Sequence, residues 1–383
     1  MKAFTQETRQ LACALMIVSG LLSASPALAG GKPILASLNS ITTLASTVPA
    51  NGDVNPYGVA QVRRTTGNLR AGHILVSNFN NSGNFQGTGS TIVDVAPDGN
   101  VSLFAAIDAA ALPGDCPGGV GLTTALVVLE QGWVIVGSLP TAAQGTVFSG
   151  AGCLIVLDSL GRPVETLHGS LINGPWDMTV FDGEQEAKLF VTNVLDGTAA
   201  AAGQVVNRGT VIRLDLKVSG YAKPVLESIS VIASGFPQRT DPAALVIGPT
   251  GVGLRASCAS DADDCDRDGA LLYVADTLSN RIAVIDHPLG RTTSAGIGRT
   301  LTAGGSLNGP LGLTVTPGGE LLTVNGGDGF ITEITPGGAQ VAKTLLDDTG
   351  SPPGAGALFG LAFDPAHGVY FVDDASNTLN LLH

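Results

Sequence analysis

The sequence is short of charged residues, and of basic ones above all. Lysine and arginine number 19 against 32 aspartates and glutamates, which gives a formal net charge of −13 at pH 7. A chain this acidic repels nucleic acid and anionic lipid surfaces, so we expect no nucleic-acid partner. Charged residues make up only 13% of the chain, whereas glycine occurs 52 times. Sparse charge with abundant glycine favours many short strands joined by tight turns.

Several motifs of enzymes and metal proteins are also missing. There is no C-x-x-C pair, which argues against a zinc or haem site, and no G-x-S-x-G motif for a serine nucleophile. Amphipathic helical periodicity is hard to find beyond the N-terminal region. No later segment is long and apolar enough to cross a bilayer. These absences leave the catalytic residues, if there are any, unassigned.

The N-terminal region has the features of a secretory signal. A basic stretch precedes the apolar run Leu11–Leu22, and an A-x-A cleavage site ends at Ala29. The apolar run is too short and wrongly flanked for a membrane span. We therefore expect residues 1–29 to be a signal peptide and residues 30–383 to form one exported domain. Its expected location is the periplasm or the extracellular space, and we expect a monomer.

Short apolar runs recur along the remaining chain as a unit of about 50–65 residues. Each unit has a turn-forming opening with a first strand, a second strand that ends in a polar residue, and two further strands. The openings are Asn55–Val59, Gly119–Leu122, Gly174–Met178, Asp241–Leu245, Gly309–Leu313 and Leu358–Leu361. Four antiparallel strands in each unit predict an all-β fold, a six-bladed β-propeller.

The two ends of the chain predict how the ring of blades closes. The last unit stops at His383, after its third strand, and Ser40–Ser46 forms a spare strand ahead of the first opening. This N-terminal strand can complete the last blade as its outer edge, which removes an exposed edge pair. A sandwich would not predict a missing strand at one end and a spare one at the other.

The stretch YVADTLSNRIAVI, Tyr273–Ile285, resembles the NHL repeat, which reads roughly Y-V-A-D-x-x-N-x-R-I-x-V. One extra residue separates Asp276 from Asn280, which we expect to shape a turn. Arg281 is expected to open the third strand and pair locally, with a carboxylate of a neighbouring blade as one candidate partner. The resemblance implies a six-bladed propeller, with a distant likeness to the gluconolactonase/regucalcin-like group. It implies no activity, because one fold hosts many functions.

Polar residues end the second strand of each blade. In a propeller these strand ends lie on the same face as the links between blades, so we expect them around one mouth of the central channel. They are Asn78, Ser138, Asn193, Asp276, Asn325 and Asp373. Propellers of the gluconolactonase/regucalcin-like group hold a divalent cation there, and hard cations prefer such oxygen ligands. That group also uses a glutamate in the first opening, which this chain lacks. The alternative is that these residues cap strand ends.

An acidic segment provides a second candidate site. Asp264, Asp266 and Asp268 precede Gly269 in the pattern D-x-D-x-D-G. Alternating aspartates can wrap Ca²⁺, with glycine making the sharp turn. No flanking helices are visible, so this is not an EF-hand. The segment carries either a structural Ca²⁺ or solvated carboxylates in a small disulfide loop, and either role concerns stability.

Four cysteines follow the predicted signal peptide, and an even number in an exported protein indicates disulfides. Cys116 lies in a link between blades, and Cys153 begins a third strand on the same face of the same unit. We predict the pairs Cys116–Cys153 and Cys258–Cys265. The alternative is unpaired buried thiols.

Two functions are compatible with these features. The first is a binding scaffold for a protein, peptide, glycan or other ligand at the loop-rich face of the channel. The second is a metal-dependent hydrolase, lactonase or lyase of the gluconolactonase-like kind, with a divalent cation at the channel mouth. The missing opening glutamate and the lack of a clear base favour the scaffold.

Overall fold

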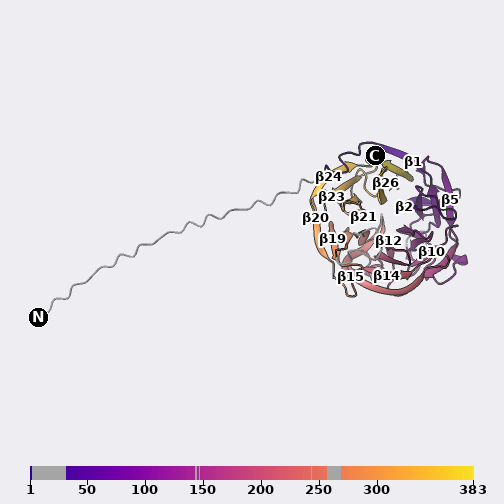
Figure 1. The fold of residues 1–383 in the computed structure, drawn as a ribbon, viewed down its shortest axis with the longest axis horizontal. Helices are drawn as coiled ribbons and strands as arrows, with labels where there is room; N and C mark the ends of the chain where they lie inside the picture. The colour runs from indigo at the N-terminus through magenta and orange to yellow at the C-terminus, as the bar shows by residue number, and fades with distance from the viewer. Residues whose placement is uncertain (2–31, 143–144, 146, 243, 257–268) are drawn as a thin grey trace. The chain divides into compact units, whose positions relative to one another are not determined.

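The computed structural model describes residue 1 and residues 32–142, 145, 147–242, 244–256 and 269–383. From Pro33 to His383, the described strands form six antiparallel sheets in a ring (Figure 1). Five of these sheets have four strands, and the third along the chain has five. The predicted six-bladed β-propeller is therefore confirmed.

The strands follow one another from the inner to the outer edge of each blade, except that β1 joins the last blade. The first blade consists of β2 (Val54–Gln61), β3 (Ile74–Asn80), β4 (Thr91–Val95) and β5 (Val101–Ala106). The second consists of β6 (Leu122–Val128), β7 (Val134–Ser138), β10 (Cys153–Leu157) and β11 (Pro163–Leu167). The third consists of β12 (Pro175–Asp182), β13 (Glu186–Asn193), β14 (Val206–Lys217), β15 (Val225–Asp241) and β16 (Leu245–Ile247).

The remaining blades are regular. The fourth consists of β17 (Pro249–Arg255), β18 (Leu271–Asp276), β19 (Arg281–Asp286) and β20 (Arg299–Ala303). The fifth consists of β21 (Pro310–Val315), β22 (Leu321–Asn325), β23 (Phe330–Ile334) and β24 (Gln340–Leu345). The sixth consists of β25 (Leu358–Asp364), β26 (Gly368–Asp373), β27 (Thr378–Leu382) and β1 (Ile41–Ser46). Outside the blades lie the hairpin β8 (Thr141–Ala142) and β9 (Val147–Phe148), and the short helices η1 (Ala109–Ala111) and α1 (Thr198–Ala201).

The ring closes as the sequence predicts. Strand β1 pairs antiparallel with β27, and Ile41 lies opposite Leu382. Just before β1, the buried Glu333 carboxylate accepts hydrogen bonds from the backbone N–H groups of Ile34 (3.0 Å) and Leu35 (2.8 Å). Leu35 itself is buried between the fifth and sixth blades. The N-terminal segment of the propeller is therefore held by sheet pairing, burial and a carboxylate.

Burial follows the position of each strand in its blade. All five residues of β22 are buried, because this central strand is covered on both faces by the neighbouring blades. The outer strand β24 instead alternates between half-buried and exposed residues. Outer strands therefore show the period of two, whereas central strands show continuous apolar runs.

The inner strands approach one another closely around the channel. In four of these inner strands, the residue that pairs with the end of the second strand is followed two positions later by a glycine. A Cβ at these positions would collide with the inner strand of the next blade. These glycines are Gly58, Gly251, Gly312 and Gly360. The third blade has Asp177 at the equivalent position, between Pro175 and Met178.

The boundary between the third and fourth blades differs from the sequence prediction. The predicted opening Asp241–Leu245 belongs to the third blade, where Leu245 pairs with Asp241 across the β15–β16 turn. The fourth blade opens at Pro249 instead. Strand β15 is 17 residues long, so it extends beyond its own blade toward the ring centre, where Leu245 and Val246 join a central apolar cluster.

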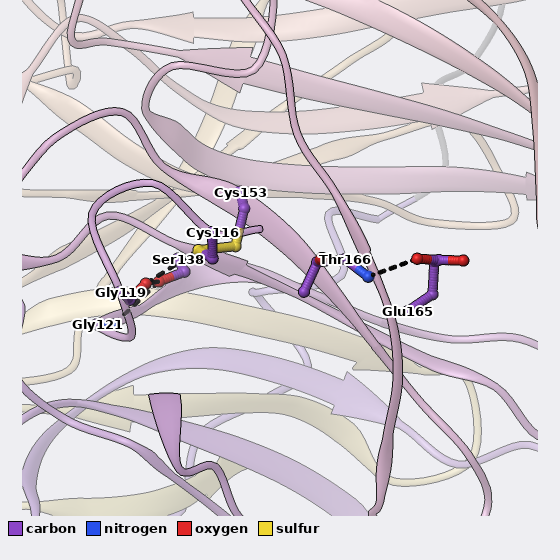
Figure 2. The surroundings of a disulfide bond; sticks show 7 residues. All are labelled: Cys116, Gly119, Gly121, Ser138, Cys153, Glu165 and Thr166. Carbon is purple, nitrogen blue, oxygen red and sulfur yellow. Dashed lines mark hydrogen bonds between the residues drawn. A yellow bond between two sulfur atoms is a disulfide. The ribbon is translucent and has the colours of Figure 1, made fainter. Parts of the chain in front are cut away.

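The predicted disulfide Cys116–Cys153 is present, with a Cα–Cα distance of 5.3 Å (Figure 2). It joins the link between the first two blades to the start of β10. The Ser138 hydroxyl fixes the same link, because it donates a hydrogen bond to Gly119 O (2.9 Å) and accepts one from Gly121 N (3.0 Å) (Figure 2).

Replacing both Cys116 and Cys153 with serine should lower the free energy of unfolding by roughly 2–4 kcal/mol, because the bridge restricts the unfolded chain. Urea denaturation of the variant and the wild type measures this difference. The control is the wild type unfolded under reducing conditions, which should lose at least as much stability. An unchanged midpoint in the variant would show that the bridge contributes nothing.

Candidate functional site

Three of the predicted channel-mouth residues bind the backbone of the link that leads into the inner strand of their own blade. The side-chain amide of Asn78 donates to Thr47 O at 3.0 Å. The side-chain oxygen of Asn193 instead accepts hydrogen bonds from Asn173 N and Gly174 N, both at 3.3 Å. Asn325 does both, because its oxygen accepts from Asn308 N (3.1 Å) and its amide donates to Ser306 O (2.9 Å). With Ser138, these side chains fix how each blade follows the previous one.

The two acidic members of the set are also engaged locally. Asp276 is fully buried, and one of its carboxylate oxygens accepts a hydrogen bond from Arg281 Nε at 2.8 Å. Arg281 also donates to Thr300 Oγ1 and Ile297 O in the outer part of the blade. Asp373 accepts a bond from Ser376 N at 3.3 Å. The expected local pairing of Arg281 is therefore present, within its own blade.

Among the described residues, no group of three or more histidines, cysteines, aspartates or glutamates is placed to hold a metal ion. One carboxylate oxygen of Asp276 is paired with Arg281, whereas the other and Asn78 Oδ1 are buried without a hydrogen-bond partner among the described groups. A role of Asn78, Asn193, Asp276, Asn325 and Asp373 in binding a cation or another ligand stays a prediction.

An apolar plug fills the ring centre at this end of the channel. It contains inner-strand residues of several blades together with two residues of β16. They are Tyr57, Trp176, Leu311, Phe359, Leu245 and Val246, with Phe79 and Leu139 behind them. The Tyr57 ring stacks on Phe359, with ring centroids 4.0 Å apart, and on Phe79 at 4.4 Å. The face where we predicted a polar site is therefore closed by packed side chains.

A polar cavity of about 400 Å³ lies along the rest of the channel. All six inner strands contribute to its wall, from β2, β6, β12, β17, β21 and β25. Pro175 in β12 pairs with Asn193 at the plugged end, and Asp182 pairs with Ala187 at the other end. Since Asp177 and Asp182 both line the cavity, it runs from beneath the plug to the opposite face of the ring.

Asp177 lies at the inner end of this cavity and is buried. Its carboxylate accepts hydrogen bonds from the backbone N–H groups of Met178 (2.8 Å) and Val252 (3.0 Å), so it bridges the third and fourth blades. Burial raises the pKa of Asp177 to about 7, although the two N–H groups lower it in part. A carboxyl group with this pKa is present in both protonation states at neutral pH.

A second carboxyl group with a raised pKa lies at the outer end. Burial raises the pKa of Asp182 to about 6; the Glu130 N–H lowers it, the Glu130 charge raises it, and Arg63 lowers it. The Glu130 N–H donates to Asp182 Oδ2 at 2.7 Å. Glu130, Asp182 and Arg63 all line the cavity. Asp182 is half-buried, and acids with shifted pKa values in a cavity mark a candidate functional site.

Sequence reasoning missed these residues. Asp177 lies inside a blade opening, where we regarded the residues as turn formers and packing groups. A signal was present, because four other openings carry glycine where the third has aspartate. Asp182, Glu130 and Arg63 lie at or beyond strand ends on the face opposite the predicted mouth, and no local pattern distinguishes them from surface charges.

Asp264, Asp266, Asp268, Cys258 and Cys265 lie outside the described residues. The calcium site and the second disulfide therefore stay predictions. No helix in the part of the chain that the structure describes is long and apolar enough to cross a membrane.

Several solved structures share the six-bladed propeller architecture. A gluconolactonase from Xanthomonas campestris is similar, with 14% identity and a TM-score of 0.52 over 89% of this chain and 88% of that chain. A calcium-binding regucalcin from Agrobacterium tumefaciens has 13% identity and a TM-score of 0.51 over 88% and 92%. A streptogramin B lyase has 13% identity and a TM-score of 0.48 over 89% and 96%.

At these identities the likeness concerns the fold alone. No protein-family model matches the sequence, and no curated protein sequence matches it significantly. The resemblance of Tyr273–Ile285 to the NHL repeat therefore stays a prediction, whereas the gluconolactonase/regucalcin-like architecture is shared.

Proposed function

We propose that the protein is a hydrolase of small cyclic esters or related acyl compounds, and that it binds its substrate in the central cavity. The observation that carries this proposal is the buried Asp177 carboxyl, whose pKa is raised to about 7, in the wall of a cavity that all six blades line. A carboxyl group that exchanges its proton near neutral pH is suited to general acid–base catalysis.

Asp177 would act first as a general base. Its carboxylate takes a proton from a water molecule that attacks the substrate carbonyl, and the resulting acid then gives the proton to the leaving oxygen. The N–H groups of Met178 and Val252 hold the carboxylate in one orientation throughout. The inner strands of all six blades would surround a bound substrate, and polar contacts strengthen where the substrate displaces water.

Two further observations support an enzyme over a binding scaffold. The loop face that a scaffold would use is closed at its centre by the apolar plug. A gluconolactonase shares this architecture, which supports lactone hydrolysis as a reaction that such a fold can host. In the proposed reaction, Asp177 supplies the proton transfers. The regucalcin that shares the fold is a calcium-binding protein. The test of the proposal therefore includes addition of Ca²⁺ and other divalent cations.

We also propose that the protein works outside the cytoplasm, with residues 1–29 acting as its signal peptide. The basic and apolar pattern that ends in Ala27-Leu28-Ala29 supports this. The partner is then a small molecule of the periplasm or the extracellular space.

The test is hydrolysis of a panel of lactones and aryl esters by the purified protein, with and without a chelator, followed by added Ca²⁺, Zn²⁺ or Mn²⁺. We expect turnover by the wild type and its loss in Asp177→Asn. The matched control is Asp374→Asn. Burial raises the pKa of Asp374 to about 7 as well, and the charge of Asp373 adds to that rise. Asp374 follows β26 at the plugged end, away from the cavity.

Turnover that survives Asp177→Asn but is lost in Asp374→Asn would move the site to the plugged face and overturn the proposal. The absence of turnover on the whole panel, with or without added ions, would overturn it too and favour the scaffold.

A further inference from the structure

A second hollow, of about 640 Å³, adjoins the cavity at its outer end. Its walls come from the first, fourth, fifth and sixth blades, and Gln61, Leu254, Val315 and Phe363 line both spaces. Two arginines line it: Arg63, which lies just beyond β2 and also lines the cavity, and Arg255, the last residue of β17. A substrate that enters the cavity from this face passes both side chains.

Neither of these arginine side chains has a hydrogen-bond or ion-pair partner among the described residues. Eight of the fourteen other described lysines and arginines pair with a carboxylate. The paired residues are Arg162, Lys188, Arg208, Arg213, Lys223, Arg239, Arg281 and Arg299. Two unpaired guanidinium groups in one hollow are therefore available to a ligand.

The position of Arg255 is supported by the turn beneath it. Gly319 lies between β21 and β22, and a Cβ there would come within 3.1 Å of Arg255 Cδ. The arginine stem therefore packs on bare backbone, which limits its freedom. Among the described residues, the nearby carboxylates are engaged elsewhere and do not line the hollow: Glu320 accepts a bond from Thr316, and Asp364 binds Gln61 and His367.

The two arginines flank the carboxylates at the outer end of the channel, because the first and fourth blades lie on either side of the second and third. Glu130 and Asp182 line the cavity but not the hollow, whereas Arg255 lines the hollow and Arg63 lines both. An anionic group is attracted by the arginines and repelled by the carboxylates. We therefore expect it to bind in the hollow rather than deeper in the cavity.

We propose that Arg63 and Arg255 form a subsite for an anionic group, a carboxylate or a phosphate, carried by the substrate. Guanidinium groups bind such planar or tetrahedral oxyanions through charge-assisted hydrogen bonds. The assignment to a substrate rests on the proposed hydrolase, whereas anion binding itself does not. With its anion at this subsite, the uncharged part of the substrate extends toward Asp177.

The test is isothermal titration of the mature protein at low ionic strength with inorganic phosphate and, separately, with succinate. We expect one site per chain, with affinity that falls as salt is added. Arg63→Gln and Arg255→Gln should each weaken binding roughly tenfold, the usual effect of losing one charged hydrogen bond. The comparison of the two anions distinguishes phosphate from carboxylate recognition. The matched control Arg162→Gln removes one positive charge from a residue paired with Asp158 and should bind as the wild type does.

Absence of binding of both anions to the wild type would overturn the subsite, as would an equal loss in Arg162→Gln. Kinetics connect the subsite to the reaction. For lactones matched with and without a carboxylate, the two variants should raise KM only for the carboxylate-bearing member and leave kcat unchanged. If the anions bind but no lactone is turned over, the hydrolase proposal fails and the subsite stands. If lactones are turned over but no anion binds, the subsite proposal fails and the hydrolase proposal stands.

Discussion

Replacing Arg281 with methionine is expected to lower the free energy of unfolding by about 3–5 kcal/mol, because it leaves the buried Asp276 charge without its partner. The Asp276 side chain is fully buried, and the Arg281 side chain is only 8% exposed. The remaining oxygen of Asp276 already lacks a hydrogen-bond partner among the described groups. No nearby group is therefore placed to compensate for the lost guanidinium.

Urea denaturation at pH 7 measures this effect. The control is the double variant Asp276→Leu/Arg281→Met, which removes both charges and should recover much of the lost stability, because no buried charge remains. A single variant as stable as the wild type would show that the pair does not hold the fourth blade. The same would follow from a double variant less stable than the single one. Either result would return Asp276 to the candidates for ligand binding.

Replacing Asp177 with asparagine should lower turnover of the best lactone substrate by about 10²–10⁴-fold, the usual contribution of a general acid–base group. Because burial raises the pKa of Asp177 to about 7, kcat/KM of the wild type should rise with pH through neutrality and then level off. A pH–rate profile measures both features. Residual activity in the variant should lack this inflection, and an unchanged inflection there would assign it to another group.

The pH dependence of the free energy of unfolding gives an independent measurement of the pKa of Asp177. The folded-state pKa of Asp177 lies above the unfolded value of about 3.9, so the folded chain binds a proton that the unfolded chain releases. The stabilisation linked to this proton is fully present below the unfolded pKa and is lost as pH rises through about 7. Asp177→Asn should therefore gain stability relative to the wild type between pH 5 and pH 8.

Urea denaturation at several pH values measures this difference. Asp374→Asn, whose carboxyl also has a pKa raised to about 7, should show the same trend in stability while keeping its activity. A pH-independent difference between Asp177→Asn and the wild type would contradict the raised pKa.

Local patterns were enough to predict most of the fold. Turn-forming openings and short apolar runs recur because every blade packs between two neighbouring blades in the same way. The spare strand before the first opening pairs with β27 as expected. The exception is Asp241–Leu245. An Asp-Pro pair followed by apolar residues has the same local pattern as a blade opening, but only the length of β15 shows that this segment reaches the ring centre.

The candidate site was predictable only in part. The strand-end residues Asn78, Asn193 and Asn325 were recognised as a set, yet whether they face a ligand or the backbone of a link depends on the path of that link. Asp177 departs from the glycine of four other openings, and that departure alone does not reveal a cavity. Its pKa depends on burial and on Val252 of the next blade, which is distant in the sequence.

The sequence by itself determined the repeated blade, the closure by the N-terminal strand and the Cys116–Cys153 bridge, because each depends on short-range pattern or on a fixed place within the repeat. Only the tertiary structure decided which face of the ring is closed and which is polar. The channel takes a few residues from each of six inner strands, so its chemistry arises when distant segments meet. The plug, the raised pKa of Asp177 and the two arginines without a described partner all arise because segments distant in the sequence lie together around the channel.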